Sequence, residues 1–482
     1  METWITILVT LLYVYIFVTT IYLLLENRET STTLTWLLVF IFVPFLGIFF
    51  YFIFGRGTKK KIRNYIVPQN LEGRIQDIDS RIVEKQKKEM ESLGAKYLSA
   101  GHVKLMRLLY RNSHSILTRR NNLDLFFRGK DKFDVLLEDF EKAEKYIHME
   151  YFIWKPDVLS ERVTAVLKRK AAQGVSVRIL YDSVGNYLSK RYLKRLRRDG
   201  VRIYAYYNYL SPFKLHTLNY RNHRKMVIID GNTGYIGGMN MGEEYISGGK
   251  RFPSWRDTHI RVQGQSVTVL QEIFSVSWLN TTGEVLDFIE PVPLSAGKPG
   301  LLPIQITTSG PDSEWESIKQ LYFLLISSAE ETIFIHTPYF IPDSSIGIAL
   351  KTAALSGVDV RIMLTGLLDK HLPYWVAMTF FRDLLAAGVR IFYYTKGFMH
   401  AKTIVVDSKT CSVGTANMDI RSFQLNYEIN ALIYDDNISG TIEEMFYRDM
   451  EYAEEFTMED YNRIHTVKHL RNSLARLFAP LL

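Results

Sequence analysis

The sequence HRKMVIIDGNTGYIGGMN at residues 223–240 returns as HAKTIVVDSKTCSVGTAN at residues 400–417. His, Lys, Asp, Gly and Asn are among the residue types that keep their places in both copies. They are His223, Lys225, Asp230, Gly237 and Asn240 in the first copy, and His400, Lys402, Asp407, Gly414 and Asn417 in the second. One such motif would be weak evidence, because a long chain meets it by chance. Two copies in register indicate an internal duplication.

Further blocks repeat on the N-terminal side of each motif, in the same order. They are residues 143–147, 174–179 and 200–204, which return as 329–333, 357–362 and 388–392. Each block begins or ends a β-like run, and the segments between them have the apolar spacing of helices. This alternation predicts an α/β fold made of two duplicated lobes packed about a pseudo-twofold axis. A stretch rich in Pro and Gly separates the copies, so we place lobe 1 at residues 105–290 and lobe 2 at residues 304–482.

The N-terminal region has the pattern of a membrane protein. No charged residue occurs at residues 3–25 or 30–55, and each stretch exceeds the roughly 20 residues that cross a bilayer. A cleaved signal peptide is the alternative for the first stretch, but a basic n-region is missing. We expect a hairpin of two transmembrane helices at residues 1–58, followed by a charged helical connector at residues 59–104. Five basic residues follow the second stretch, which predicts that the lobes are cytoplasmic. They are Arg56, Lys59, Lys60, Lys61 and Arg63.

The amino-acid composition excludes several classes of protein and of metal site. The chain has 482 residues, of which 47% are hydrophobic, so a disordered or fibrous protein is excluded. Its single cysteine, Cys411, excludes a disulfide framework and a thiol-rich metal site. The net charge of +8 favours an anionic partner without distinguishing lipid from nucleic acid.

The spacing inside the motif predicts which side chains face a common cavity. Side chains alternate along a strand, so each His and the Lys two residues later point the same way. Asp230 and Asp407 have the opposite parity and begin a turn, where an Asx-type hydrogen bond is the preferred role. A hairpin then returns the chain to Asn240 and Asn417, which we expect to point inward.

Two His, two Lys and two Asn in one cavity suit a phosphodiester. Ammonium and amide groups can hold its oxygens, which predicts Asn240 and Asn417 as phosphate-binding residues. One imidazole can attack phosphorus to give a covalent phosphohistidine, while the other acts as acid and base. An attacking imidazole needs a carboxylate behind it, and Asp257 and Glu428 are the candidates, although structural ion pairs are an equal alternative for both. The spacing of the eleven His predicts no metal site, and no cofactor is expected.

These motifs resemble those of the phospholipase D superfamily, whose paired H-x-K-x-x-x-x-D motifs match His223/Lys225/Asp230 and His400/Lys402/Asp407. The resemblance implies that all six belong to the catalytic set. More narrowly, the chain resembles bacterial cardiolipin synthases over almost its whole length. The stretches that carry this likeness are EYFIW at residues 150–154, TPYFIPD at 337–343, WRDTH at 255–259 and GTANMDIRS at 414–422.

The resemblance implies an inner-membrane enzyme that transfers a phosphatidyl group from one phosphatidylglycerol to another and releases glycerol. It also implies that His223 is the nucleophile and His400 the acid and base, an order that the pseudo-symmetry of the sequence leaves open. The expected partners are phosphatidylglycerol and anionic membrane lipid, and nucleic acid is not expected. The sequence does not predict the oligomeric state.

Three alternatives remain at this stage. The same residues would serve a membrane-tethered nuclease or a phospholipase D hydrolase, and a lipid-binding scaffold without activity is the third. The C-terminal tail, with Leu470, Leu474 and Leu477 beside basic residues, fits either a docked helix or a short interfacial helix.

Overall fold

The computed structural model describes residues 2–25, 30–43, 47, 51, 100–206, 219–286 and 300–479. The chain divides into two compact units. The larger unit contains Ile66–Tyr207 and Arg221–Leu482, and therefore both copies of the repeated motif.

The N-terminal part of the chain is helical where it is described. Helix α1 spans Glu2–Leu25 and α2 spans Thr30–Phe42, and Leu23 and Phe40 are buried together. Among the described residues, no helix meets the length and hydropathy required of a membrane span. The transmembrane hairpin thus stays a prediction, and most of the predicted connector, residues 59–99, lies outside the described residues.

One large mixed β-sheet forms the centre of the larger unit. Counted outward from the boundary between β1 and β10, the two halves contain equivalent strands in the same order, and the second half has one extra edge strand, β20. From one edge to the other, the order is β4 (Arg202–Ala205), β3 (Ser176–Tyr181), β2 (Tyr146–Tyr151), β6 (Met226–Ile229), β7 (Thr233–Gly237), β9 (His259–Gly264), β1 (Leu117–Phe126), β10 (Leu301–Ser309), β19 (Asn426–Tyr434), β17 (Thr410–Gly414), β16 (Thr403–Val406), β11 (Thr332–His336), β13 (Asp359–Thr365), β14 (Arg390–Tyr394) and β20 (Ala453–Phe456).

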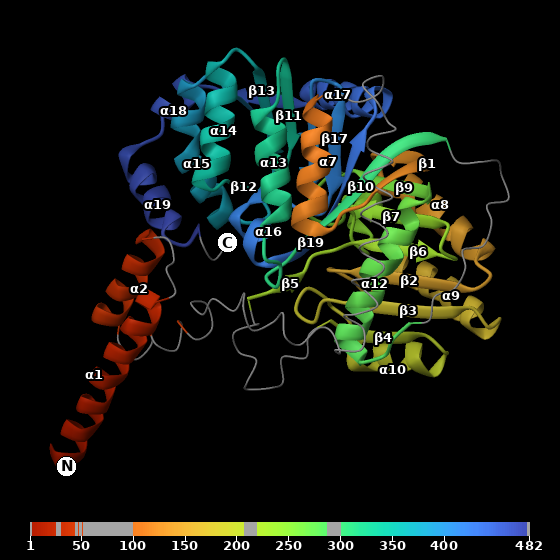
Figure 1. Ribbon diagram of the computed structural model, residues 1–482, viewed down its shortest axis with the longest axis horizontal. Coiled ribbons are helices and arrows are strands. Elements are labelled where there is room, and N and C mark those ends of the chain that lie inside the picture. Colours follow the sequence, from red (N-terminus) through yellow and green to blue (C-terminus); the bar gives the residue numbers. More distant parts are fainter. Residues whose placement is uncertain are drawn as a thin grey trace. The chain divides into compact units, whose positions relative to one another are not determined.

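The two halves of this sheet are built alike. The first half has the parallel strands β2, β3 and β4 and the second has β11, β13 and β14, while the strands nearer the middle are antiparallel. The antiparallel pair β1 and β10, with Leu117 opposite Gln305, joins them into one continuous sheet (Figure 1). The α/β prediction is therefore confirmed, and the duplication appears as a pseudo-twofold relation between the halves.

Helices cover the sheet in both halves. The first half contains α8 (Gly129–Lys142), α9 (Val158–Ala172), α10 (Lys190–Arg198), α11 (Glu244–Ser247) and α12 (Ser266–Thr282). The second contains α13 (Ser317–Ser327), α14 (Ser344–Leu355), α15 (His371–Ala386), α16 (Ile420–Gln424), α17 (Asp436–Met450), α18 (Met458–Asn462) and α19 (Thr466–Arg476). Helix α7 (Ala100–Ser113) precedes all of these in the sequence but packs against the second half, where Leu105 and Leu109 are buried with Leu321 of α13. The duplication extends to helix capping, since Asp157 and Asp343 each accept a backbone N–H bond 3.0 Å long at the start of α9 and α14.

Part of the hydrophobic core belongs to both halves. Phe274 and Trp278 of α12 pack in one cluster with Ile304 of β10 and with Ile429 and Ile433 of β19, and all five are fully buried. Separation of the two halves would expose this cluster to water, so burial of the cluster stabilises each half against the other.

We expect Ile304→Ala to lower the free energy of unfolding by about 2–5 kcal/mol, because it leaves a cavity in the shared core. Chemical unfolding followed by tryptophan fluorescence measures this. Ile348→Ala, at an exposed position of α14, is the control and should change the free energy by no more than about 0.5 kcal/mol. Equal effects of the two substitutions would contradict a core shared by both halves.

Candidate active site

Two short parallel strand pairs bring the repeated motifs together. β5 (Arg221–Asn222), just before the first motif, pairs with the start of β19 in the second half. Reciprocally, β15 (Phe398–Met399), just before the second motif, pairs with β8 (Trp255–Arg256) in the first half. In each half, the short strand just before the histidine therefore pairs with a strand of the other half.

The backbone of each histidine continues this exchange. The N–H of His223 donates to the carbonyl of Tyr427 at 3.0 Å, and the N–H of His400 donates to the carbonyl of Arg256 at 2.7 Å. The residues that follow these two carbonyls are Glu428 and Asp257. The pairing thus places a carboxylate of the opposite half beside each imidazole ring.

Both imidazoles bond to these carboxylates. Nδ1 of His223 lies 2.9 Å from Oε1 of Glu428, and Nδ1 of His400 lies 2.7 Å from Oδ2 of Asp257. Both carboxylates are fully buried. A carboxylate that accepts the Nδ1–H of a neutral imidazole leaves the lone pair on Nε2, the outer nitrogen. The sequence nominated both carboxylates, but it gave no sign that each would serve the histidine of the other half.

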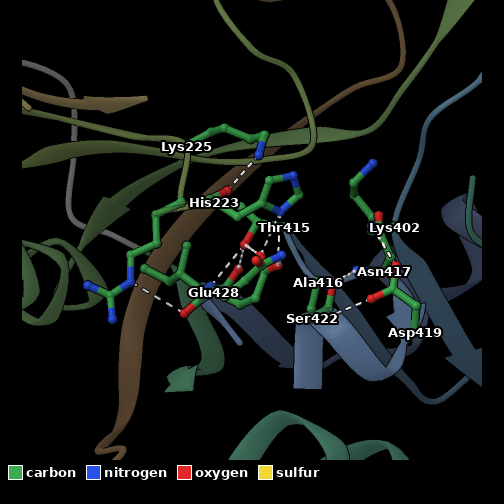
Figure 2. Close-up of polar contacts among 12 residues, drawn as sticks. His223, Lys225, Lys402, Thr415, Ala416, Asn417, Asp419, Ser422 and Glu428 are labelled. Atoms are coloured by element: carbon green, nitrogen blue, oxygen red, sulfur yellow. Dashed lines mark hydrogen bonds and ion pairs between the residues drawn. The ribbon is translucent and has the colours of Figure 1, made fainter. Parts of the chain in front are cut away.

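The Glu428 carboxylate has further donors around it. The hydroxyl of Thr415 donates to its Oε2, and Nδ2 of Asn426 donates to its Oε1 at 3.1 Å (Figure 2). Burial alone would raise the pKa of Glu428, but His223, Lys225 and the Thr415 hydrogen bond lower it to about 2. Glu428 is therefore an anion at neutral pH.

Two lysines are buried at the same place. Lys225 and Lys402 are at most 1% exposed, and the Nζ of each donates to the backbone carbonyl of the histidine two residues before it. Burial lowers the pKa of Lys225 to about 7 and that of Lys402 to about 8. Burying two neighbouring ammonium groups costs free energy, and an anionic ligand bound between them would reduce this cost.

Burial also controls the imidazoles. It lowers the pKa of His223 and of His400 to about 4, and the lysine charges act in the same direction. Each histidine responds to the lysine of the other half as well as to its own, so the four groups share one electrostatic environment. Figure 2 shows His223 between Lys225 and Lys402, with Glu428 behind the ring. Both imidazoles are neutral at pH 7.

The two asparagines are buried and already bonded. Oδ1 of Asn240 accepts the N–H of Ile153 at 3.1 Å, and its Nδ2 donates to the hydroxyl of Tyr245 at 2.9 Å. Nδ2 of Asn417 donates to Oδ2 of Asp419 at 3.0 Å. An amide nitrogen carries two hydrogens, so each asparagine keeps one N–H for a ligand.

Asp230 and Asp407 hold the backbone elsewhere. The Asp230 carboxylate accepts the N–H groups of Glu144, Lys145 and Tyr146 at 2.7–2.8 Å, where the chain enters β2. Asp407 does the same at the entrance of β11 and accepts from residues 330, 331 and 332 at 2.7–3.0 Å. Neither side chain bonds to the imidazoles, as the strand parity indicated. Their acceptor role is long-range and differs from the local Asx turn expected from the sequence.

Sequence reasoning missed several residues that shape the site. The hydroxyl of Tyr245 lies 3.4 Å from Nδ1 of His400, and the ring of Phe152 meets that of His223 at 4.9 Å between centroids. Asp182 accepts the N–H of Asn222 at 2.8 Å and so holds β5. Tyr245 and Asp182 lie outside the repeated blocks, and no spacing pattern marks them, whereas Phe152 lies in the EYFIW stretch at residues 150–154 but was not assigned to the site. In the part of the chain that the structure describes, no group of three or more His, Cys, Asp or Glu could hold a metal ion.

Comparisons with known proteins agree with this geometry. A family model described as a cardiolipin synthase, PLD-like domain, matches residues 136–249 and 322–450, and one described as phospholipase D-nuclease N-terminal matches residues 11–56. The major cardiolipin synthase ClsA of Bacillus subtilis is 41% identical over 463 residues, which cover 95% of both chains. A cardiolipin synthase of Listeria monocytogenes serotype 4b is 40% identical over 479 residues, which cover 98% of both.

A solved structure shares the fold. The phosphatidylserine synthase of Haemophilus influenzae matches with a TM-score of 0.58 over 79% of this chain and 100% of its own. At 16% sequence identity, this match supports the arrangement of the duplicated sheet and says nothing of the substrate.

We expect Asp230→Ala to destabilise the fold, because the N–H of the buried residue Tyr146 loses its acceptor, at a cost of about 1–3 kcal/mol. Thermal unfolding measures the loss, and Asp407→Ala should behave alike. Asp131→Ala is the control. Asp131 is exposed, and its ion pair with Arg128 at 3.8 Å contributes little to the free energy of unfolding. Unchanged stability of both Asp230→Ala and Asp407→Ala would refute the structural role of these carboxylates.

Proposed function

The chain belongs to the cardiolipin synthase family of phospholipase D-like proteins, and from this we propose that it transfers a phosphatidyl group from one phosphatidylglycerol to another, giving cardiolipin and glycerol. One observation carries the proposal beyond family membership. Two neutral imidazoles, each held by a carboxylate of the opposite half, share one buried environment with two lysines.

The first step forms a covalent intermediate. Nε2 of His223 attacks phosphorus, the bond from phosphorus to the glycerol oxygen breaks, and His400 gives its proton to that oxygen. His400 carries this proton because the phosphodiester anion raises the proton affinity of the groups around it. Glycerol leaves, and the phosphatidyl group stays on His223.

The second step reverses the first with a different alcohol. A hydroxyl of a second phosphatidylglycerol gives its proton to His400, and its oxygen bonds to phosphorus while the bond to His223 breaks. Lys225 and Lys402 hold the phosphate oxygens, and the remaining N–H groups of Asn240 and Asn417 assist them. In this proposal Asp257 and Glu428 orient the imidazoles, while Asp230 and Asp407 stabilise the lobes and take no part in the chemistry.

The location of the enzyme is also a proposal. The match of residues 11–56 to the N-terminal family model and the two uncharged stretches support a multi-pass anchor in the bacterial cell membrane. The basic residues after the second stretch favour catalytic lobes on the cytoplasmic side, at residues 105–290 and 304–482. Phosphatidylglycerol, a membrane lipid, would then be reached from the inner leaflet.

His223→Ala and His400→Ala should each lower the rate of cardiolipin formation by about 10³-fold or more, because one step loses its nucleophile or its proton carrier. Thin-layer analysis of products from labelled phosphatidylglycerol, with EDTA present, measures the rate. His114→Asn is the control, since His114 is exposed and its backbone φ of 51° suits asparagine.

The wild-type enzyme should also retain labelled phosphate after an alkaline denaturing quench, and peptide mapping should place the label on His223. Full activity of either alanine variant would contradict the two-histidine site. Label on His400 instead would reverse the proposed order, and release of nucleotides from nucleic acid in place of glycerol would identify a nuclease.

The lysine pKa values predict how activity depends on pH. The ratio kcat/KM reports ionisations of the free enzyme, and protonated lysines are the form that binds phosphate. Since Lys225 and Lys402 lose their protons near pH 7 and 8, kcat/KM should fall as the pH rises through this range. Initial rates at low phosphatidylglycerol concentration, between about pH 6 and pH 9, measure this limb. A kcat/KM that rises throughout this range would show that the deprotonated lysines are the active form.

A further inference from the structure

Helix α19 exposes an apolar face. Val467, Leu470, Leu474, Leu477 and Phe478, which we call the α19 apolar stripe, are each more than half exposed. Helices on a protein surface normally turn such residues to the core. A continuous exposed stripe of this kind marks a surface that contacts a membrane or another protein.

The stripe is not the result of a poorly docked helix. On its other side, α19 packs along α15, where Ala475 and Ala479 are buried with Val376. The guanidinium carbon of Arg471 lies 4.4 Å from the ring centroid of Trp375, and that of Arg476 lies 4.6 Å from Phe380. Small and basic residues thus hold the helix in place, and the large apolar side chains are left facing outward.

The helix lies beside the candidate active site. Ala475 and Ala479 belong to the same cluster as Ile341 of β12 (Phe340–Ile341). Ile341 pairs with Asp419 of β18 (Met418–Asp419), and Asp419 accepts the amide of Asn417. Helix α19 is thus connected to a residue of the site through α15, β12 and β18.

The charge of α19 indicates which body this is. The helix carries Lys468, Arg471 and Arg476 and no acidic residue. Large apolar side chains flanked by basic ones are typical of helices that lie in the interface of an anionic bilayer. A second protein fits less well, because stable protein interfaces use about 20–30 residues a side and the stripe offers five.

We propose that α19 is an interfacial helix whose apolar stripe inserts at the headgroup boundary of an anionic bilayer. This insertion would hold the second half of the larger unit at the membrane surface. This inference rests on the proposed function, in which the substrate is a bilayer lipid. It adds a second contact with the membrane, independent of the N-terminal segment.

Substrate presentation tests the proposal. The full-length variant Leu470→Ser/Leu474→Ser/Leu477→Ser should lose about tenfold in kcat/KM when phosphatidylglycerol is diluted in phosphatidylcholine vesicles. With a short-chain phosphatidylglycerol below its micellar concentration, it should match the wild type. The control, Ile348→Ser/Leu355→Ser, alters two exposed apolar residues of α14 and should lose nothing on either substrate. An equal loss on both substrates would make the stripe merely structural and overturn the proposal.

A fluorescent probe gives a readout that does not depend on activity. An environment-sensitive dye on Leu474→Cys should shift to the blue and be quenched by bromolipids in vesicles that contain phosphatidylglycerol, while the same dye on Ile348→Cys should do neither. The native Cys411 is buried and does not react. A dye on Leu474→Cys that remains in water, or that cross-links to a second copy, would overturn the proposal. If the dye responds but no cardiolipin forms, the proposed function fails and the interfacial helix stands.

Discussion

The structure of the site depends on an exchange between the halves, in which each histidine is held by the carboxylate of the other half. The hydrogen bonds from His223 to Glu428 and from His400 to Asp257 cross the pseudo-twofold axis in opposite directions. An isolated half would hold an imidazole without its carboxylate and a buried carboxylate without its donor, an arrangement that burial makes costly. Docking of the halves and assembly of the site are therefore one event.

Burial of the lysines follows from the same arrangement. Lys225 and Lys402 lie on loops and are almost completely buried, and this burial lowers the pKa of both ammonium groups. A protein tolerates such strain at a site where a ligand removes it. In the proposed reaction, a phosphodiester would supply the missing negative charge, so its binding would restore the protonated state of the lysines and provide the electrostatic stabilisation that phosphoryl transfer requires.

The sequence predicted the parts of this site better than their assembly. Duplication and the α/β pattern are local properties, so residues 223–240 and 400–417 were enough to place His and Lys together and Asp230 apart. The strand alternation expected for His and Lys was wrong, because residues 223–225 lie between β5 and β6 and residues 400–402 lie between β15 and β16. The pairing of β5 with β19 is a contact between halves, and no periodicity within one repeat encodes it. For the same reason the partners of Asp230, which stand at residues 144–146 on a different strand, could not be read from its own turn.

The pseudo-symmetry of the site is broken beside the two carboxylates, where the first copy has Gly238 and the second has Thr415. A Cβ at Gly238 would lie 2.0 Å from Oδ1 of Asp257, so only glycine lets that carboxylate approach, whereas Thr415 adds a hydroxyl donor to Glu428. Glu428 is thereby fixed as an anion, and an anion best stabilises the positive charge that an imidazole gains on phosphorylation. Asp257 instead accepts the backbone N–H of Thr258 at 2.7 Å. In the proposed reaction, the additional donor on Glu428 would suit His223 as the nucleophile and would leave His400 to move the proton.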